Sequence, residues 1–322
     1  MARLLDSVLG HQEVIVRFLQ SMERQKLPHN FLFVGPSGVG RRTTALALAQ
    51  ALLCEKSRIG CGVCGSCLRI AKGGASESLL VIEPEKNQIR LEQAQQILNF
   101  LSLRSLGSHR VVIVDGADCL NPQAANSLLK SLEEPPPGTF FFLIASSASH
   151  VLPTLRSRAQ VVAFQPLTVE EMKKKAKSVP EWALKASQGS FERLSQLLEK
   201  EELEIRDQAL NWLADWVETP MAYLNPVYRD LVRDRESARS LAHQISGLLR
   251  DTLYLKLGAN GKILNTDKIS LFRPWAEALS ETQLLEACEK SLWIEMKLDA
   301  NQDSSLVFEQ FWIETTPQTV VT

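Results

Sequence analysis

One stretch near the N-terminus places an apolar segment, a glycine-rich turn and a helix-forming segment directly one after another. The apolar run 31–34 predicts a buried strand, and the alanine- and leucine-rich run 45–53 predicts a helix. Between them, Gly35, Gly38 and Gly40 lie in the pattern of a phosphate-binding loop, in which backbone N–H groups at a helix N-terminus cradle phosphates. This order of strand, loop and helix predicts a fold built around a parallel α/β sheet.

The side chains that normally work in such a loop are missing. The usual pattern ends in Lys and then Ser or Thr, where the Lys reaches the β- and γ-phosphates and the hydroxyl holds Mg²⁺. Here Arg41 and Arg42 fill those two positions, and Thr43 follows one residue late, roughly 100° further around the helix. We therefore expect a degenerate nucleotide site that does not hydrolyse ATP·Mg²⁺. A glycine-rich turn that never meets a nucleotide remains the alternative.

A second apolar strand, predicted at 110–115, ends in a carboxylate. In P-loop NTPases the Asp at the end of such a strand helps to hold Mg²⁺. Asp115 is therefore a candidate member of the same site. It is equally consistent with an Asp that only caps the following turn.

Four of the six cysteines fall within fourteen residues, at Cys54, Cys61, Cys64 and Cys67. Four thiolates suit tetrahedral Zn²⁺, and the intervening glycines allow a short loop to wrap one ion. Because four ligands leave no open position for water, the predicted zinc site is structural. A chance cluster and a redox pair of thiols are the alternatives.

Further apolar strands, predicted at 79–83, 139–147 and 161–164, alternate with predicted helices over residues 1–165, which indicates a parallel sheet covered on both faces. Residues 166–203 predict a small helical lid, and residues 204–322 predict a domain that is helical throughout. In that third domain the apolar stripe Leu284, Leu285, Cys288, Leu292 and Met296 is expected to be core. The predicted class is thus an α/β domain with a zinc insertion at 54–67, followed by two all-α domains.

The charges nearly balance, with 36 basic and 37 acidic side chains, so no overall field attracts the chain to nucleic acid. No apolar run is long enough to span a bilayer, and the first residues do not resemble a signal peptide. We expect a cytoplasmic protein without membrane contact.

Taken in order, these segments resemble the bacterial clamp loader of the DNA polymerase III holoenzyme, a family with the AAA+ fold. The resemblance rests on the loop 35–40, the four cysteines directly after its helix, and the segments 125–136 and 155–158. Within the family, the delta-prime subunits are the most similar. The resemblance implies a rigid stator beside ATP-hydrolysing motor subunits, with a C-terminal helical collar for oligomerisation. The motor subunits carry a water-activating Glu where this chain has Gly116.

The same resemblance gives Arg158 the role of an arginine finger, which would reach the γ-phosphate of ATP bound by a neighbouring subunit. Arg156 is a nearby competitor, and Ala159 replaces the Cys usual in that motif. In the lid, Glu192 falls where motor subunits carry a phosphate-sensing Arg, and a carboxylate there would repel phosphate.

The implied partners are the motor (gamma/tau) and delta subunits, with the sliding clamp and primed DNA reached through the assembled complex. Two other functions remain open: an ATP-hydrolysing motor subunit of the same loader, and a nucleic-acid-binding module built around the zinc site. The motor would need Arg41 to replace the missing Lys. The nucleic-acid module lacks an aromatic platform in its cysteine loop.

Overall fold

The computed structural model describes residues 3–73, 76–103, 107–219 and 226–316. The chain divides into two compact units: Met1–Ala176 with Gln188–Glu192, here the α/β unit, and Lys177–Ser187 with Arg193–Thr322, here the helical unit. The predicted lid, 166–203, is shared between them. The ends of the predicted first and third domains, residues 1–2 and 317–322, lie outside the described residues. The division into three domains stays a prediction.

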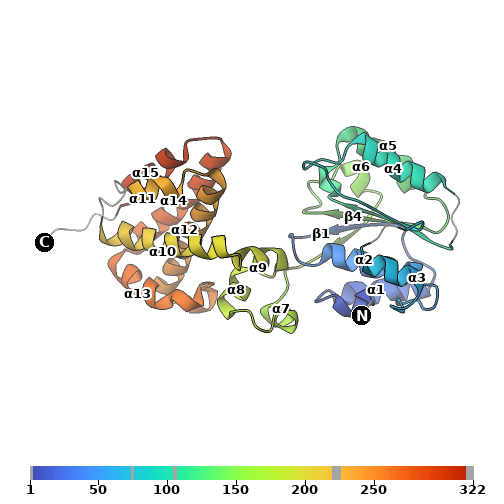
Figure 1. The fold of residues 1–322 in the computed structure, drawn as a ribbon, viewed down its shortest axis with the longest axis horizontal. Coiled ribbons are helices and arrows are strands. Elements are labelled where there is room, and N and C mark those ends of the chain that lie inside the picture. The colour runs from blue at the N-terminus through green and yellow to red at the C-terminus, as the bar shows by residue number, and fades with distance from the viewer. Residues whose placement is uncertain (1–2, 74–75, 104–106, 220–225, 317–322) are drawn as a thin grey trace. The chain divides into compact units, whose positions relative to one another are not determined.

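The α/β unit is built on a five-stranded sheet in the order β2-β3-β4-β1-β5, with every neighbouring pair parallel (Figure 1). Its strands are β1 Asn30–Val34, β2 Leu79–Ile82, β3 Arg110–Asp115, β4 Thr139–Ala145 and β5 Gln160–Ala163. All five lie where the apolar runs of the sequence predict them. Val34 pairs with Ala145 on one side and Ala163 on the other, so these three strands end at one edge of the sheet.

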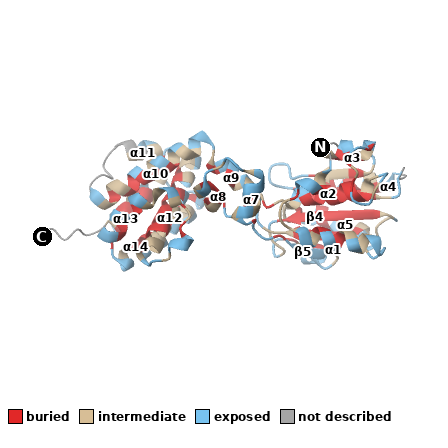
Figure 2. Ribbon diagram, turned by 90° about the horizontal axis from the view of Figure 1, so that it is seen from below, coloured by how far each residue is buried: buried red, intermediate tan, exposed pale blue. Residues whose placement is uncertain are grey.

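Alternate residues of the strands enter two separate cores, one on each face of the sheet. Val111 and Ile113 pack with the helices α1 (Gln12–Glu23) and α2 (Arg41–Leu53), whereas Val112 and Val114 pack with α4 (Leu91–Ser102) and α5 (Pro122–Glu133). β4 is buried along its whole length, whereas the edge strand β5 is largely exposed (Figure 2). This doubly covered parallel sheet confirms the predicted α/β class.

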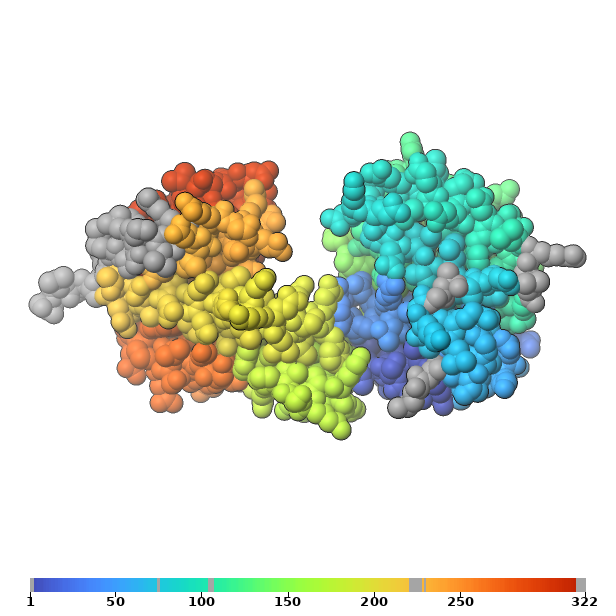
Figure 3. Space-filling view, in the orientation of Figure 1, coloured from blue at the N-terminus to red at the C-terminus, as the bar shows by residue number. Residues whose placement is uncertain are grey.

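Helices and strands of the α/β unit alternate in sequence, and α4 and α5, teal in Figure 1, form one outer face of the unit in Figure 3. Asn121 caps α5: its side chain accepts a hydrogen bond from the backbone N–H of Ala124 at 2.7 Å. The bounds are α1 Gln12–Glu23, α2 Arg41–Leu53, α3 Gly65–Ala71, α4 Leu91–Ser102, α5 Pro122–Glu133, α6 Pro153–Arg156 and α7 Val169–Lys175.

The helical unit packs long helices around one core that includes Trp216, Leu248, Phe272 and Trp312. Its helices are α8 Glu181–Ala186, α10 Lys200–Glu218, α11 Pro226–Leu231, α12 Arg235–Lys256, α13 Ile269–Ala278, α14 Glu281–Asp299 and α15 Ser304–Thr315. A further helix, α9 Phe191–Leu197, has its first two residues grouped with the α/β unit. This all-helical second part confirms the other half of the predicted fold class.

The prediction that the α14 stripe forms core is wrong for most of its members. Leu284 is fully buried, but Leu285, Leu292 and Met296 are 52%, 57% and 69% exposed. The helix instead buries Leu284, Ala287, Ser291, Ile294 and Leu298. Because α14 carries apolar residues on two faces, spacing alone could not identify the inward one, and the exposed face lies about 100° from it.

Candidate functional site

The predicted phosphate loop joins β1 to α2 at the carboxyl edge of the sheet. Gly40 precedes the first residue of α2 and has φ 101°, a left-handed conformation that favours glycine. A Cβ on Gly38 would collide with Ser190 Oγ and with the backbone of Glu192. The loop therefore has the expected backbone, but another segment of the chain lies directly against it.

Arg42 fills the region next to the loop where P-loop NTPases hold a cation. Its guanidinium forms an ion pair with Glu83, and its Nη1 donates to Asp115 Oδ2 at 3.0 Å. The hydrogen bond to Glu83 is the main reason that the pKa of Arg42 is raised, and the same bond lowers the pKa of Glu83. Asp115 is thereby paired with a permanent cation of the chain itself.

Arg41 does not extend freely from the loop. Its Nη1 donates to the carbonyl oxygen of Ala145, at the end of β4. Burial lowers the pKa of Arg41, while the nearby carboxylates of Asp115, Asp118 and Glu192 oppose that shift. The guanidinium that replaces the usual Lys is therefore surrounded by acceptors supplied by the protein.

The segment 188–192 packs onto the loop within the α/β unit. The N–H of Phe191 donates to the carbonyl oxygen of Gly38 at 3.0 Å, and Ser37 Oγ donates to the carboxylate of Glu192. Glu192 thus places a carboxylate beside Ser37 and Arg41, in the neighbourhood where the resemblance expects a phosphate sensor. A bound phosphate would be repelled by that charge.

Three further positions complete the description of this edge. Thr43 is exposed on α2, one residue beyond Arg42. Asp118 accepts from the backbone N–H of Ser146 at 2.9 Å and also from its hydroxyl. Sequence reasoning did not identify Glu83 or Asp118 as members of the site. Glu83 could have been identified from the sequence, because it directly follows the apolar strand β2 and therefore lies at the same edge of the sheet.

Arg158 lies at the other end of the sheet. It precedes β5, and its carbonyl oxygen accepts from Asn30 Nδ2, at the start of β1, at 3.0 Å. Its side chain forms an ion pair with Glu133, the last residue of α5, and its Nη1 donates to the carbonyl oxygen of Thr154 at 2.7 Å. It lines an open hollow of about 630 Å³ together with Asn30 and Glu133.

The phosphate loop and Arg158 are separated by the length of β1. The loop follows the last residue of this five-residue strand, whereas Arg158 contacts its first residue. At about 3.3 Å per residue, the separation is on the order of 15 Å. Arg158 therefore cannot serve the loop of its own chain. Arg156, the competing candidate, donates through Nη1 to the carbonyl oxygen of Ala148 at 3.2 Å.

The structure brings the four predicted metal ligands together. Their sulfur atoms all lie within 4.8 Å of one another, and the Sγ atoms of Cys61 and Cys67 are 3.9 Å apart. Zn–S bonds of about 2.3 Å place tetrahedral sulfurs roughly 3.8 Å apart, so this cluster fits one zinc ion. The four cysteines are therefore close enough to hold a metal ion.

Backbone N–H groups point at the sulfur atoms of this cluster. Cys54 Sγ accepts from the N–H of Ser57 at 3.3 Å and of Cys61 at 3.2 Å. Burial raises the pKa of Cys54, but backbone hydrogen bonds outweigh it and lower the pKa to about 6. Burial raises the pKa of Cys67 to about 12. This donor set favours thiolate at Cys54, which is the form that binds a metal.

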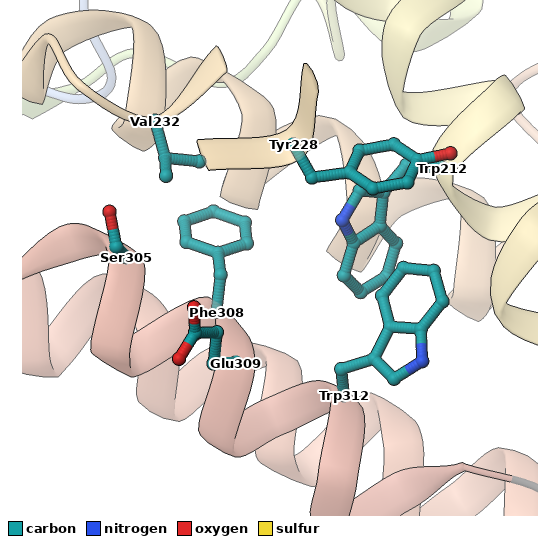
Figure 4. A pocket seen from close by; sticks show the side chains of 7 residues that line it. All are labelled: Trp212, Tyr228, Val232, Ser305, Phe308, Glu309 and Trp312. Atoms are coloured by element: carbon teal, nitrogen blue, oxygen red, sulfur yellow. The ribbon is translucent and has the colours of Figure 1, made fainter. Parts of the chain in front are cut away.

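The helical unit contains an aromatic hollow between α10, α11 and α15. It is lined by Trp212, Tyr228, Phe308 and Trp312, among others, and the two Trp rings meet edge to face with centroids 4.5 Å apart (Figure 4). Its volume is about 20 Å³, which is space for one water molecule at most. We interpret the hollow as a packing feature of the core.

Among the described residues, no helix combines the length and the apolar character needed to cross a bilayer.

Comparison with known proteins agrees with the geometry of the α/β unit. Residues 10–168 match the family described as DNA polymerase III, delta subunit. The chain is 38% identical over 140 residues to DNA polymerase III subunit delta' of Pseudomonas aeruginosa, covering 42% of each chain. It is 38% identical over 149 residues to the subunit of that name in Bacillus subtilis, covering 46% of this chain and 45% of the relative.

These two matches span less than half the length of the relatives concerned. A longer match, to DNA polymerase III subunit delta' of Yersinia pestis, covers 81% of both chains at 29% identity over 280 residues. The family match and the three relatives all name DNA polymerase III subunits, in agreement with the resemblance found in the sequence. Through residues 10–168 above all, these findings support a clamp-loader delta-prime subunit of DNA polymerase III.

Proposed function

We propose that this chain is a non-hydrolysing stator subunit of the replicative clamp loader, the assembly that loads a sliding clamp onto primed DNA. In this proposal the chain's own nucleotide site is silent, and Arg158 acts on ATP bound by a neighbouring motor subunit. The observation that carries the proposal is the separation of these two features to opposite ends of one sheet.

The side chains that fill the nucleotide site support the proposal that it does not hydrolyse ATP. A nucleotide with Mg²⁺ brings a divalent cation and a polyanion. Arg42 already supplies a cation to Asp115 and Glu83, and Glu192 already supplies an anion beside Arg41 and Ser37. Binding a nucleotide would require breaking these pairs without a Lys or a water-activating Glu to compensate. The same losses argue against the alternative, a motor subunit.

The role of Arg158 is supported by its chemistry and its place. A guanidinium can bind a phosphate through two parallel N–H bonds, and arginine fingers supplied in trans raise NTPase rates by ~10³–10⁵. Arg158 is 31% exposed at the surface of the α/β unit and lines an open hollow. A neighbouring subunit's nucleotide can therefore approach it from solvent.

The proposed zinc ion is structural. Cys54, Cys61, Cys64 and Cys67 would hold it, and four sulfur ligands fill its coordination sphere. The ion would fix the loop between α2 and α3, a part of the α/β unit remote from Arg158 in sequence. It supplies no chemistry to the loader's reaction.

The helical unit is proposed to bind the motor and delta subunits. Support comes from Leu285, Leu292 and Met296, which form an exposed apolar stripe on α14. Such a stripe is unusual on a face that meets only water, and it suits packing against the helix of another subunit. We further propose a cytoplasmic location, with clamp and DNA contacted through the assembled complex.

The proposal is tested by reconstituting the loader with its motor and delta subunits, with either the wild-type chain or Arg158→Ala. We expect the variant to assemble normally and the DNA-stimulated ATPase to fall at least tenfold, since a trans finger is lost. Arg156→Ala is the matched control and should leave the rate within about twofold. An assembled complex with unchanged ATPase after Arg158→Ala removes the finger assignment.

A further inference from the structure

The guanidinium of Arg158 is already engaged within its own chain. Nε and Nη2 both donate to Oε1 of Glu133, and the Nε bond is 2.6 Å long. Nη1 donates to the carbonyl oxygen of Thr154 at 2.7 Å and to Ser157 Oγ at 3.4 Å. These four hydrogen bonds engage a side chain that has five N–H bonds in total.

Glu133 occupies the edge of the guanidinium formed by Nε and Nη2. A carboxylate and a phosphate both bind arginine through such a pair of N–H groups, so they compete for this edge. A phosphate that reached Arg158 would also stand within a few ångströms of the Glu133 charge and be repelled by it. The contact therefore opposes the role proposed for Arg158.

The pairing is built into the fold. Asn30, which is buried, donates through Nδ2 to the carbonyl oxygen of Leu132 at 2.7 Å and to that of Arg158 at 3.0 Å. One amide therefore ties the backbone next to Glu133 to the backbone of Arg158. With both main chains held, the two side chains meet without any further rearrangement.

We propose that Glu133 restrains the arginine finger: its carboxylate pairs with Arg158 until the phosphates of a neighbouring subunit's nucleotide displace it. This inference rests on the proposed function, because it assumes that Arg158 acts in trans. The inference adds Glu133 as a regulator of the contact between Arg158 and the nucleotide. Glu133 sets the ATP concentration at which Arg158 engages.

The exposure of the pair sets the size of the effect. The side chains of Arg158 and Glu133 are 31% and 48% exposed, so water screens their attraction. Removing an exposed pair of this kind corresponds to about a two- to fivefold change in an equilibrium or a rate. The restraint is thus weak enough for a nucleotide to overcome and strong enough to measure.

The test uses the reconstituted loader with Glu133→Gln, which keeps the shape of the side chain and removes its charge. We expect the ATPase to rise about two- to fivefold at sub-saturating ATP, with a lower KM. Glu134→Gln is the matched control, since Glu134 is an exposed neighbour at the end of α5, and it should leave the rate unchanged.

A double variant separates restraint from a merely structural role. If Glu133 acts through Arg158, Glu133→Gln has no effect once Arg158→Ala is present, so the two changes are not additive. A fall in ATPase with Glu133→Gln alone, or a rate equal to the wild type, overturns the restraint while leaving the finger assignment in place. If Arg158→Ala itself has no effect, the proposed function fails and the restraint with it.

Discussion

At the scale of single residues, the carboxyl edge of the sheet is held together by charges that the chain supplies to itself. Arg42 bridges Glu83 and Asp115, and Glu192 bonds to Ser37 beside Arg41. Each of these pairs satisfies a group that would otherwise attract part of a nucleotide–Mg²⁺ complex. In the proposed silent site, Arg42 stands where a P-loop NTPase carries a hydroxyl residue, so it adds a competing cation as well as removing a ligand.

The pKa of Glu83 reports this pairing directly. The hydrogen bond from Arg42 holds the pKa of Glu83 below its ordinary 4.5. A carboxyl group whose pKa is lower in the folded state stabilises the protein at pH values above its pKa in the unfolded state. This contribution to stability is lost as the pH falls through the folded-state pKa. In Arg42→Met we expect the Glu83 pKa to rise toward 4.5, with a loss of about 0.2–1 kcal/mol at pH 7 because the pair is exposed.

Carboxyl NMR titration measures this change residue by residue. Glu171 provides the internal control, since its lowered pKa depends mainly on the N–H of Thr168 and should not respond to Arg42→Met. A Glu83 pKa that stays the same in the variant contradicts the pairing.

At the scale of elements, helix faces and short loops determine what each unit can bind. α5 ends at Glu133 and so brings that carboxylate to Arg158, while α14 directs one apolar face inward and leaves another exposed. The loop between α2 and α3 and the first turn of α3 together gather four sulfur atoms within 4.8 Å of one another.

Adjacent leucines on α14 provide a matched test of its orientation. Leu284 is fully buried and Leu285 is 52% exposed. We expect Leu284→Ala to lower the free energy of unfolding of the helical unit by about 2–5 kcal/mol, through lost burial and a cavity. Leu285→Ala should change it by less than about 0.5 kcal/mol, because surface substitutions have small effects.

Tryptophan fluorescence during urea unfolding reports on the stability of the helical unit alone, because all six tryptophans lie in residues grouped with that unit. Both variants exchange Leu for Ala within one helix, so the change in helix propensity is the same. Equal losses of stability in the two variants would contradict the assigned face.

The cysteine loop predicts a metal content of one zinc per chain. In Cys64→Ser we expect bound zinc to fall below about a tenth of the wild-type level, since three thiolates hold zinc less tightly than four. Cys119→Ser is the control, because Cys119 lies outside the cluster, and it should keep its zinc. Elemental analysis of dialysed protein distinguishes the two, and full zinc content in both variants would exclude the site.

At the scale of the whole molecule, the sequence was sufficient for the fold class and for the position of the glycine-rich loop between β1 and α2. Apolar runs and glycines are local signals, so the five strands and the helix after Gly40 could be predicted. The pairing of Arg42 with Glu83 spans 41 positions, and that of Arg158 with Glu133 spans 25. Such contacts depend on strand order, which local patterns do not contain.

The inward face of α14 was missed for a related reason. Leu284 and Leu285 are both leucines, and the choice between them is made by α12 and α15, which pack against α14, rather than by the sequence of α14. Local propensity therefore predicted the helix, and tertiary packing determined its rotation.

The central claim is that the chain's own nucleotide pocket is filled by its own charges. The most direct measurement is Mg²⁺-dependent ATP binding and turnover by the isolated, full-length chain. We predict no saturable binding by isothermal titration up to about 100 μM ATP, which means that the binding free energy is less favourable than about −5.5 kcal/mol. We also predict no ATP hydrolysis above that of a protein-free blank. Turnover in the range of about 1 s⁻¹ or faster, as enzymes commonly reach, would contradict the account.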